Sequence, residues 1–131
     1  MADAILIKPN QRIKDITPTV NMVREVGIAP ELVQNKGLWM AFVSTPPACA
    51  SAVHHHGNAE SGIYILRGKV RFYFGEKLEQ SLDAEEGDFL YVPPNLIHME
   101  ENISPRDPVE LIVSRNATEM LVVNVPDPRQ S

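Results

Sequence analysis

The sequence has a single cysteine, Cys49, among its 131 residues. One cysteine cannot form a disulfide within the chain, which is typical of a reducing compartment, so we expect a cytoplasmic protein. Aromatic residues make up 6% of the chain, and no apolar run approaches the roughly 20 residues of a membrane-spanning helix. The N-terminus lacks a basic start followed by a long apolar stretch, so we also expect no signal peptide.

Positive charge is scarce as well. The chain has 12 lysines and arginines against 17 aspartates and glutamates, which gives a formal net charge of -5. Proteins that bind nucleic acid usually gather lysine and arginine on one face, and here the basic residues are scattered along the chain. The composition therefore argues against nucleic acid and against an anionic membrane surface as partners.

Proline and glycine, by contrast, are frequent, with 11 and 7 residues. They separate short apolar runs, and no run carries the long apolar stripe of a helix. Short strands with frequent turns are typical of all-β sandwiches and barrels. We predict strands over residues 38–44, 53–59, 63–66, 69–74, 78–82, 89–92, 97–102, 110–115 and 120–125.

The length of the chain predicts one domain. Residues 1–37 are expected to form an N-terminal arm with a short strand near residues 5–7 and a short helical segment. Pro30 suits the first position of that helix, and Gly37 would end it. Residues 38–126 are expected to form the barrel, and residues 127–131 a tail.

The four histidines are the residues that indicate a functional site. His54, His55 and His56 are consecutive, and His98 follows later in the chain. Neighbouring side chains on a strand point to opposite faces, so His54 and His56 share one face and His55 points away. Two adjacent imidazoles can chelate one ion, and Glu60 and His98 would add a carboxylate and a third imidazole. Such ligands suit one divalent ion of iron, manganese, nickel, zinc or copper.

These residues lie in two ordered motifs that resemble those of the cupin superfamily. The first motif reads Gly-x5-His-x-His-x(3 or 4)-Glu-x6-Gly. The chain matches it through four residues, with Ala48 in place of the opening glycine. The matched residues are His54, His56, Glu60 and Gly68.

The second motif reads Gly-x5-Pro-x-Gly-x2-His-x3-Asn, and the chain matches its spacing from Gly87 through His98 to Asn102. Asn95 replaces a glycine, and asparagine tolerates the left-handed turn that glycine supplies. The resemblance implies an all-β, single-domain cupin fold, a double-stranded β-helix or jelly-roll barrel, with an N-terminal arm and one short helix. It also implies one divalent metal ion, with the ligand set His54, His56, Glu60 and His98.

The spacing leaves the carboxylate ligand open. Three residues separate Glu60 from His56, as the motif permits, but seven separate it from Gly68, where the motif has six. Either a β-bulge turns Glu60 inward, or Ser61 takes its position and the site has three histidines. Serine is a poor ligand for a divalent ion, so Glu60 is the preferred candidate, with Asn58 and His55 as outside candidates.

Glu60 and Glu100 are the candidate catalytic residues. Glu100 shares strand parity with His98 and would accept a proton or support the site, unless it is a solvated surface charge. No arginine or lysine is expected to point into the barrel, which argues against a sugar-phosphate substrate. The closer resemblance, on residues 54–61, 64–68 and 75–76, is to small cupins often labelled predicted mannose-6-phosphate isomerases, a label that establishes no activity.

We therefore expect a metal-dependent enzyme that acts on a small molecule. The apolar and aromatic strands favour an oxygenase for a small carbonyl or phenolic compound. The alternatives are an isomerase or epimerase of a sugar or sugar phosphate, and a non-enzymatic cupin that binds a small ligand. Small barrels leave apolar outer faces and sheet edges exposed, so we also expect a homodimer.

Overall fold

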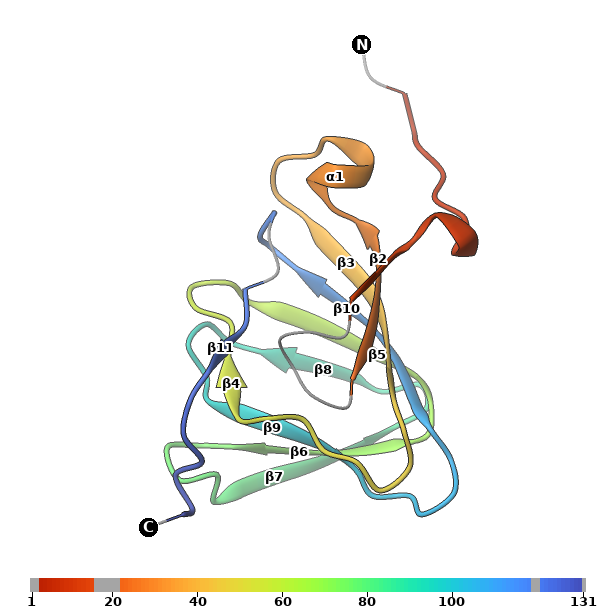
Figure 1. Cartoon of the computed structure of the whole chain (residues 1–131). Coiled ribbons are helices and arrows are strands. Elements are labelled where there is room, and N and C mark those ends of the chain that lie inside the picture. Colours follow the sequence, from red (N-terminus) through yellow and green to blue (C-terminus); the bar gives the residue numbers. More distant parts are fainter. Residues whose placement is uncertain (1–2, 16–21, 119–120, 131) are drawn as a thin grey trace.

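Two antiparallel β-sheets face each other in the computed structural model, which describes residues 3–15, 22–118 and 121–130 (Figure 1). In spatial order, the six-stranded sheet contains β1 (Ile13–Asp15), β2 (Val23–Ile28), β3 (Trp39–Thr45), β10 (Val109–Arg115), β5 (Ser61–Arg67) and β8 (Phe89–Val92). The five-stranded sheet contains β11 (Val123–Asn124), β4 (His54–His55), β9 (His98–Asn102), β6 (Lys69–Phe74) and β7 (Gln80–Glu85). The predicted all-β fold is confirmed.

The barrel takes in more of the N-terminal region than we expected. β1 and β2 lie within the predicted arm, yet they pair with each other and β2 pairs with β3, so both belong to the six-stranded sheet. The predicted strand over residues 5–7 is wrong, because these residues have no regular structure. At the other end of the chain, the predicted strand over 120–125 starts outside the described residues, and β11 covers only Val123–Asn124.

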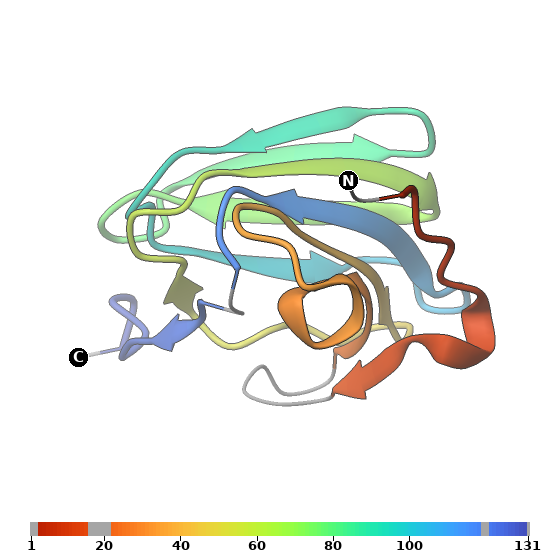
Figure 2. The ribbon, with the colours of Figure 1, turned by 90° about the horizontal axis from the view of Figure 1, so that it is seen from above.

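Two short helices complete the described part of the chain. A 3-10 helix, η1, spans Pro9–Gln11, and α1 spans Pro30–Val33, where a short helix was predicted. Gln34, with a left-handed φ of 55°, ends α1 before Gly37 is reached. No helix in the described ranges has the length and apolar character needed to cross a bilayer. The N-terminal arm (red) and the C-terminal segment (dark blue) lie at opposite ends of the molecule (Figure 2).

The core lies between the two sheets because each long strand buries every second side chain. β10 is central in its sheet, pairs with β3 and β5, and buries Val109, Leu111 and Val113. From the opposite sheet, β6 contributes Val70 and Phe72. Full burial of such a side chain contributes about 1.5–3 kcal/mol to stability, so this alternation holds the sheets together.

Several motif residues outside the histidines shape turns or tie loops to strands. Asn95 has a φ of 61°, the left-handed conformation that its place in the motif predicts. Ala48, in place of the opening glycine, is left-handed as well, with a φ of 58°. A side chain at Gly68 would meet the carbonyl oxygen of Pro108 at 2.6 Å.

Asn102 ends β9 and is 1% exposed. Its side-chain NH2 group shares its two hydrogens among the carbonyl oxygens of Thr45, Pro46 and Asp107, at 3.1, 3.1 and 2.8 Å. Its side-chain oxygen accepts a hydrogen bond from the backbone N–H of Ser104 at 3.0 Å. The motif asparagine therefore joins β9 to the end of β3 and to the turn before β10.

Candidate metal centre

Three of the four histidines meet inside the barrel. His54 on β4 lies directly opposite His98 on β9, and His56 follows just after β4. One ring nitrogen of each lies within 4.8 Å of the others, and all three side chains are buried. His55 is half-buried and lies outside this group, and its Nδ1 accepts a hydrogen bond from the backbone N–H of Gly57 at 3.0 Å. The structure thus has the predicted alternation of these histidines.

Backbone carbonyls orient all three imidazoles in the same way. Nδ1 of His54 bonds the carbonyl oxygen of Ala52 at 2.7 Å, and Nδ1 of His56 bonds that of Leu121 at 2.6 Å. Nδ1 of His98 bonds the carbonyl oxygen of Leu96 at 2.9 Å. A carbonyl can only accept, so each Nδ1 carries the hydrogen and each Nε2 keeps a lone pair.

The histidine group fits a metal ion on the chemistry of its donors. His98 Nε2 is buried and has no hydrogen-bond partner among the described residues. A buried polar atom without a partner is costly, and a metal ion would satisfy this lone pair. Metal-bound histidines usually donate the other ring N–H to a carbonyl or carboxylate, which is the arrangement of all three residues here.

Burial keeps the three imidazoles neutral. It lowers the pKa of His54 to about 4, of His56 to about 2 and of His98 to about 3. The positive charge of Arg115 also contributes to these lowered pKa values, while the carbonyl hydrogen bonds act in the opposite direction. Since only a neutral imidazole can bind a metal, the three histidines are in the competent form at neutral pH.

Phe72 holds the third histidine in place. Its ring stacks on that of His98, with centroids 4.8 Å apart and planes inclined by 20°. Phe72 is 2% exposed and belongs to β6, the strand next to β9. The packed core therefore restricts the rotation of this imidazole.

The structure corrects the prediction for Glu60. Glu60 is exposed and lies outside the histidine group, and its backbone N–H donates to Asn116 Oδ1 at 2.8 Å. Ser61 is 2% exposed and begins the inward-facing set of β5. The bulge in the pairing of β5 with β10 lies at the far end, next to Glu110, and does not turn Glu60 inward. The three-histidine alternative describes this site, and Asn58 is exposed as well.

Glu100 faces the barrel interior, as its parity with His98 predicted, and is not a solvated surface charge. It is 9% exposed and lines a cavity together with His54 and His56. Burial raises the pKa of its carboxyl group, and the charges of Arg24 and Arg115 oppose that shift.

Two inward arginines were missed at the sequence level. Arg24 and Arg115 are each 3% exposed and line the same cavity, so the expectation of an interior without basic residues is wrong. Strand parity would have found Arg115, because it continues the inward set Leu111 and Val113 on β10. Arg24 likewise shares parity with the buried Val26 on β2.

The cavity beside the histidines is small and has both polar and apolar lining residues. Its volume is about 20 Å³, which is room for about one water molecule. Its polar lining consists of His54, His56, Ser61, Glu100, Arg24 and Arg115. Its apolar lining consists of Met22, Val43, Ile63, Val92, Leu111 and Val113.

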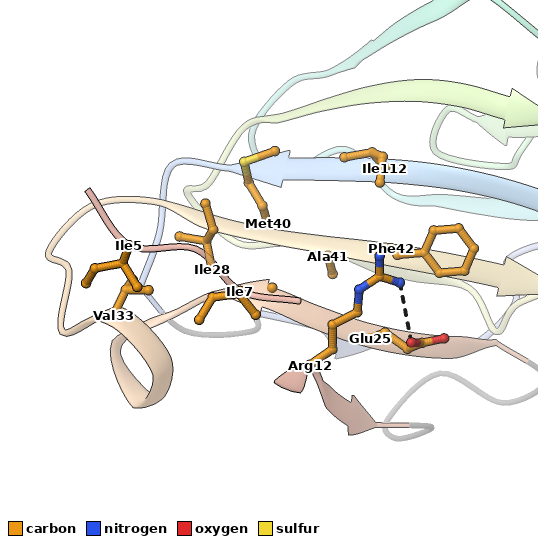
Figure 3. A pocket seen from close by; sticks show the side chains of 11 residues that line it. Ile5, Ile7, Arg12, Glu25, Ile28, Val33, Met40, Ala41, Phe42 and Ile112 are labelled. Atoms are coloured by element: carbon orange, nitrogen blue, oxygen red, sulfur yellow. Dashed lines mark hydrogen bonds and ion pairs between the residues drawn. The ribbon is translucent and has the colours of Figure 1, made fainter. Parts of the chain in front are cut away.

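A larger hollow, of about 250 Å³, lies on the outer side of the six-stranded sheet (Figure 3). Ile5 and Ile7 of the N-terminal arm line it together with apolar residues of β2, α1, β3 and β10. An ion pair between Arg12 and Glu25, 3.4 Å long, also lines this hollow. No histidine lines it, so this surface is separate from the candidate metal centre.

Comparison with known families agrees with the geometry. A family model described as a cupin domain matches residues 41–115, which include the three grouped histidines, Glu100 and Arg115. The chain belongs to the cupin family. No curated protein matches this cupin in sequence.

Solved structures share the fold of this cupin at low sequence identity. The polyketide cyclase RemF from Streptomyces resistomycificus has a TM-score of 0.78 at 14% identity, over 98% of this chain and 92% of its own. An oxalate decarboxylase from Lactobacillus farciminis, in complex with formate, has a TM-score of 0.75 at 15% identity, over 88% of this chain and 34% of its own. An uncharacterised conserved protein with a double-stranded β-helix domain, from Klebsiella pneumoniae, has a TM-score of 0.71 at 12% identity, over 95% of this chain and 99% of its own. Such identities establish the fold alone, and this cupin spans about a third of the decarboxylase.

Proposed function

We propose that this cupin is a metal-dependent enzyme that acts on a small, oxygen-bearing molecule. The observation that carries the proposal is the convergence of His54, His56 and His98, each with Nδ1 bonded to a carbonyl. One divalent ion, held by the three Nε2 atoms, would polarise an oxygen atom of the bound molecule. Structural metal sites usually have four protein ligands, often sulfur, whereas three ligands leave positions for a substrate.

The chain's own residues supply the remaining parts of such a site. Glu100 is the one acidic side chain among the described residues of the cavity, so it is the candidate to accept or return a proton. Val92, Ile63 and Val113 form apolar walls that exclude water. Glu60 has no part in this proposal, because its side chain is exposed outside the histidine group.

The apolar walls favour the oxygenase among the reactions considered, with a small carbonyl or phenolic compound as substrate. The inward arginines remove the argument against a sugar-phosphate isomerase, so the isomerase is the alternative that the test has to separate from the oxygenase. The family match is to the cupin domain as a whole and singles out no isomerase. RemF is a polyketide cyclase and its likeness is one of fold, so a cyclase is a further outcome that the test should detect.

The test starts with metal analysis of protein purified without a polyhistidine tag or added metal. Iron-loaded protein is then screened for oxygen uptake with small diketones and phenolic ketones, with sugar phosphates alongside. Oxygen uptake that requires iron and vanishes in His98→Ala supports the oxygenase. Turnover of a sugar phosphate without oxygen uptake supports the isomerase instead, and ligand binding without any product supports a binding protein.

A further inference from the structure

His56 depends for its orientation on the C-terminal segment, residues 121–130. For the other two grouped histidines, the carbonyl oxygen bonded to Nδ1 lies two residues earlier in the chain. For His56 the partner is the carbonyl oxygen of Leu121, which is 65 residues further along the chain and 2.6 Å away. Two imidazoles are therefore oriented by their immediate neighbours, whereas the third is oriented only when a distant segment is in place.

The C-terminal segment reaches this position as the edge of the five-stranded sheet, where β11 lies beside β4 (Figure 1). β11 pairs with β4 over two residues, and the backbone N–H of Val125 then donates to the carbonyl oxygen of Val53 at 3.0 Å. So short a strand at a sheet edge is marginally stable by itself. Side-chain contacts beyond β11 are therefore needed to keep the segment docked.

Val125 is the apolar anchor of the segment. It packs against a small hydrophobic cluster whose buried members are Val53, Leu78 and Met99. Met99 directly follows His98 on β9, and His98 points into the barrel, so Met99 points to the outer side of the sheet. Val125 thus docks on the outer side of the strand that carries the third histidine.

Arg129 is the polar anchor. Its Nη2 donates to Sδ of Met99 at 3.3 Å, and its guanidinium carbon lies 5.7 Å from the centroid of the Tyr73 ring. Asp127 accepts hydrogen bonds from Nε and Nη2 of Arg129 at 3.0 and 2.8 Å, which orients the guanidinium. Tyr73 and Met99 are directly opposite each other on β6 and β9, so Arg129 ties the end of the segment to two strands.

The two anchors differ in strength. The side chain of Arg129 is 44% exposed, so water screens its contacts, and their loss should weaken docking only a few-fold. A charged group in place of Val125 would have to be buried in an apolar cluster, which is strongly unfavourable. Val125→Asp is therefore the variant expected to undock the segment.

We propose that the C-terminal segment positions the candidate metal centre: when it is docked on β4, β6 and β9, the Leu121 carbonyl keeps the hydrogen of His56 on Nδ1 and leaves Nε2 for the ion. Val125 and Arg129 are the positioning residues. The inference rests on the proposed metal centre and names what controls its affinity for the ion. Because coupling between two sites is reciprocal, a bound ion also stabilises the docked segment.

Zinc affinity, measured by competition with a chelator, tests this coupling. Val125→Asp should bind zinc about 10- to 100-fold more weakly than wild type, because that is the usual effect of losing the hydrogen bond behind a metal-bound histidine. Arg129→Gln should bind it a few-fold more weakly. Wild-type affinity in Val125→Asp would overturn the proposal.

Each variant has a matched control that should keep wild-type zinc affinity. Val33→Asp introduces the same charge at a half-buried valine of α1, which lines the hollow on the outer side of the six-stranded sheet. Arg67→Gln removes an exposed arginine that pairs with Glu110 at 3.8 Å on that same sheet.

A double-mutant cycle separates positioning of His56 from a general loss of structure. In a His56→Ala background, Val125→Asp should change zinc affinity by no more than about twofold, whereas in a His54→Ala background it should have its full effect. Equal effects in both backgrounds would show that the segment supports the whole fold and would refute its action through His56. Thermal unfolding followed by circular dichroism shows whether Val125→Asp is folded; if it is not, Val125→Ala takes its place in the cycle.

Nuclear magnetic resonance of metal-free protein separates failure of this inference from failure of the metal centre. In wild type, the imidazole nitrogen shifts should show the hydrogen of His56 on Nδ1. Val125→Asp should lose this fixed tautomer at His56 and retain it at His54 and His98, whose carbonyl partners are local. An unchanged tautomer at His56 would overturn the inference. Absence of zinc binding in wild type would instead refute the metal centre.

Discussion

His54 and His98 lie directly opposite each other on β4 and β9, and their ring centroids are 4.3 Å apart. This strand pair joins the two histidine motifs, which are far apart in the chain. Because the pairing is backbone to backbone, the relative position of the two imidazoles depends on strand register and not on a flexible loop.

Removal of a grouped histidine should remove the metal. His54→Ala or His98→Ala deletes one of three Nε2 donors, and the remaining two cannot hold the ion as tightly, so most bound metal should be lost. His55→Ala is the matched control, since His55 lies outside the group, and it should retain its metal. Metal content by mass spectrometry after dialysis checks this. Equal loss from the His55 variant would contradict the assigned orientation.

Substitution of Glu100 should lower turnover, whereas substitution of Glu60 should not. Glu100→Gln keeps the shape of a buried side chain but removes a proton acceptor, so turnover should fall by about 100-fold or more while metal content stays unchanged. Glu60→Gln changes an exposed side chain and should alter neither. Steady-state kinetics on the substrate found by the screen, together with metal analysis, compares them. A larger fall in turnover for Glu60→Gln than for Glu100→Gln would assign Glu60 to the catalytic site.

Acid should destabilise the metal-free protein in a defined pH window. The three histidines have folded pKa values of about 4, 2 and 3, against an ordinary value of 6.5. Below about pH 6.5 the unfolded chain therefore binds protons that the folded chain excludes, so the free energy of unfolding falls as pH falls. The slope should be on the order of 1 kcal/mol per pH unit for each histidine.

Urea unfolding of metal-free protein between pH 7.5 and 4.5 measures this slope. His56→Gln removes one of the three titrating groups, so it should show a shallower slope than wild type. A free energy of unfolding that does not change between pH 6.5 and 5 would show that the imidazoles are not held neutral by burial.

Asn102 should contribute to the stability of the fold and not to catalysis. Asn102→Ala removes the NH2 group that three carbonyl oxygens share, those of Thr45, Pro46 and Asp107, and the oxygen that accepts from the Ser104 N–H. The free energy of unfolding should fall by roughly 2–4 kcal/mol. Asn116→Ala, which removes a single exposed contact to the Glu60 N–H, should cost less than about 1 kcal/mol. Chemical denaturation of both variants gives the comparison.

The homodimer remains a prediction. Phe89 and Tyr91 on β8 are 83% and 60% exposed, and the Phe89 ring lies 4.8 Å from that of Tyr64 on β5. Exposed aromatic residues at the edge of a sheet favour burial against a second copy. Light scattering at micromolar concentration should give about twice the 14.6 kDa of one chain, and Phe89→Lys should shift the mass toward the monomer. A wild-type mass of one chain would disprove the dimer.

Local patterns in the sequence determined where most strands lie and which histidines share a face. The strand over Lys69–Phe74 and the short helix at Pro30 follow from alternation and turn residues, which act over a few positions along the chain. The left-handed turn at Asn95 likewise follows from its place in the motif. These features need no knowledge of distant partners.

Only the tertiary structure decided between Glu60 and Ser61. Two neighbouring residues at the start of a strand face opposite sides, and the register of that strand determines which one faces inward. Here Ser61 pairs with Val92 on one side and with Arg115 on the other, which places the serine inside and the glutamate outside. The inward position of Arg115 also depended on the tertiary structure. Its buried guanidinium contacts the Trp39 ring and hydrogen-bonds Ser61, and these residues come together only when β3, β10 and β5 pair.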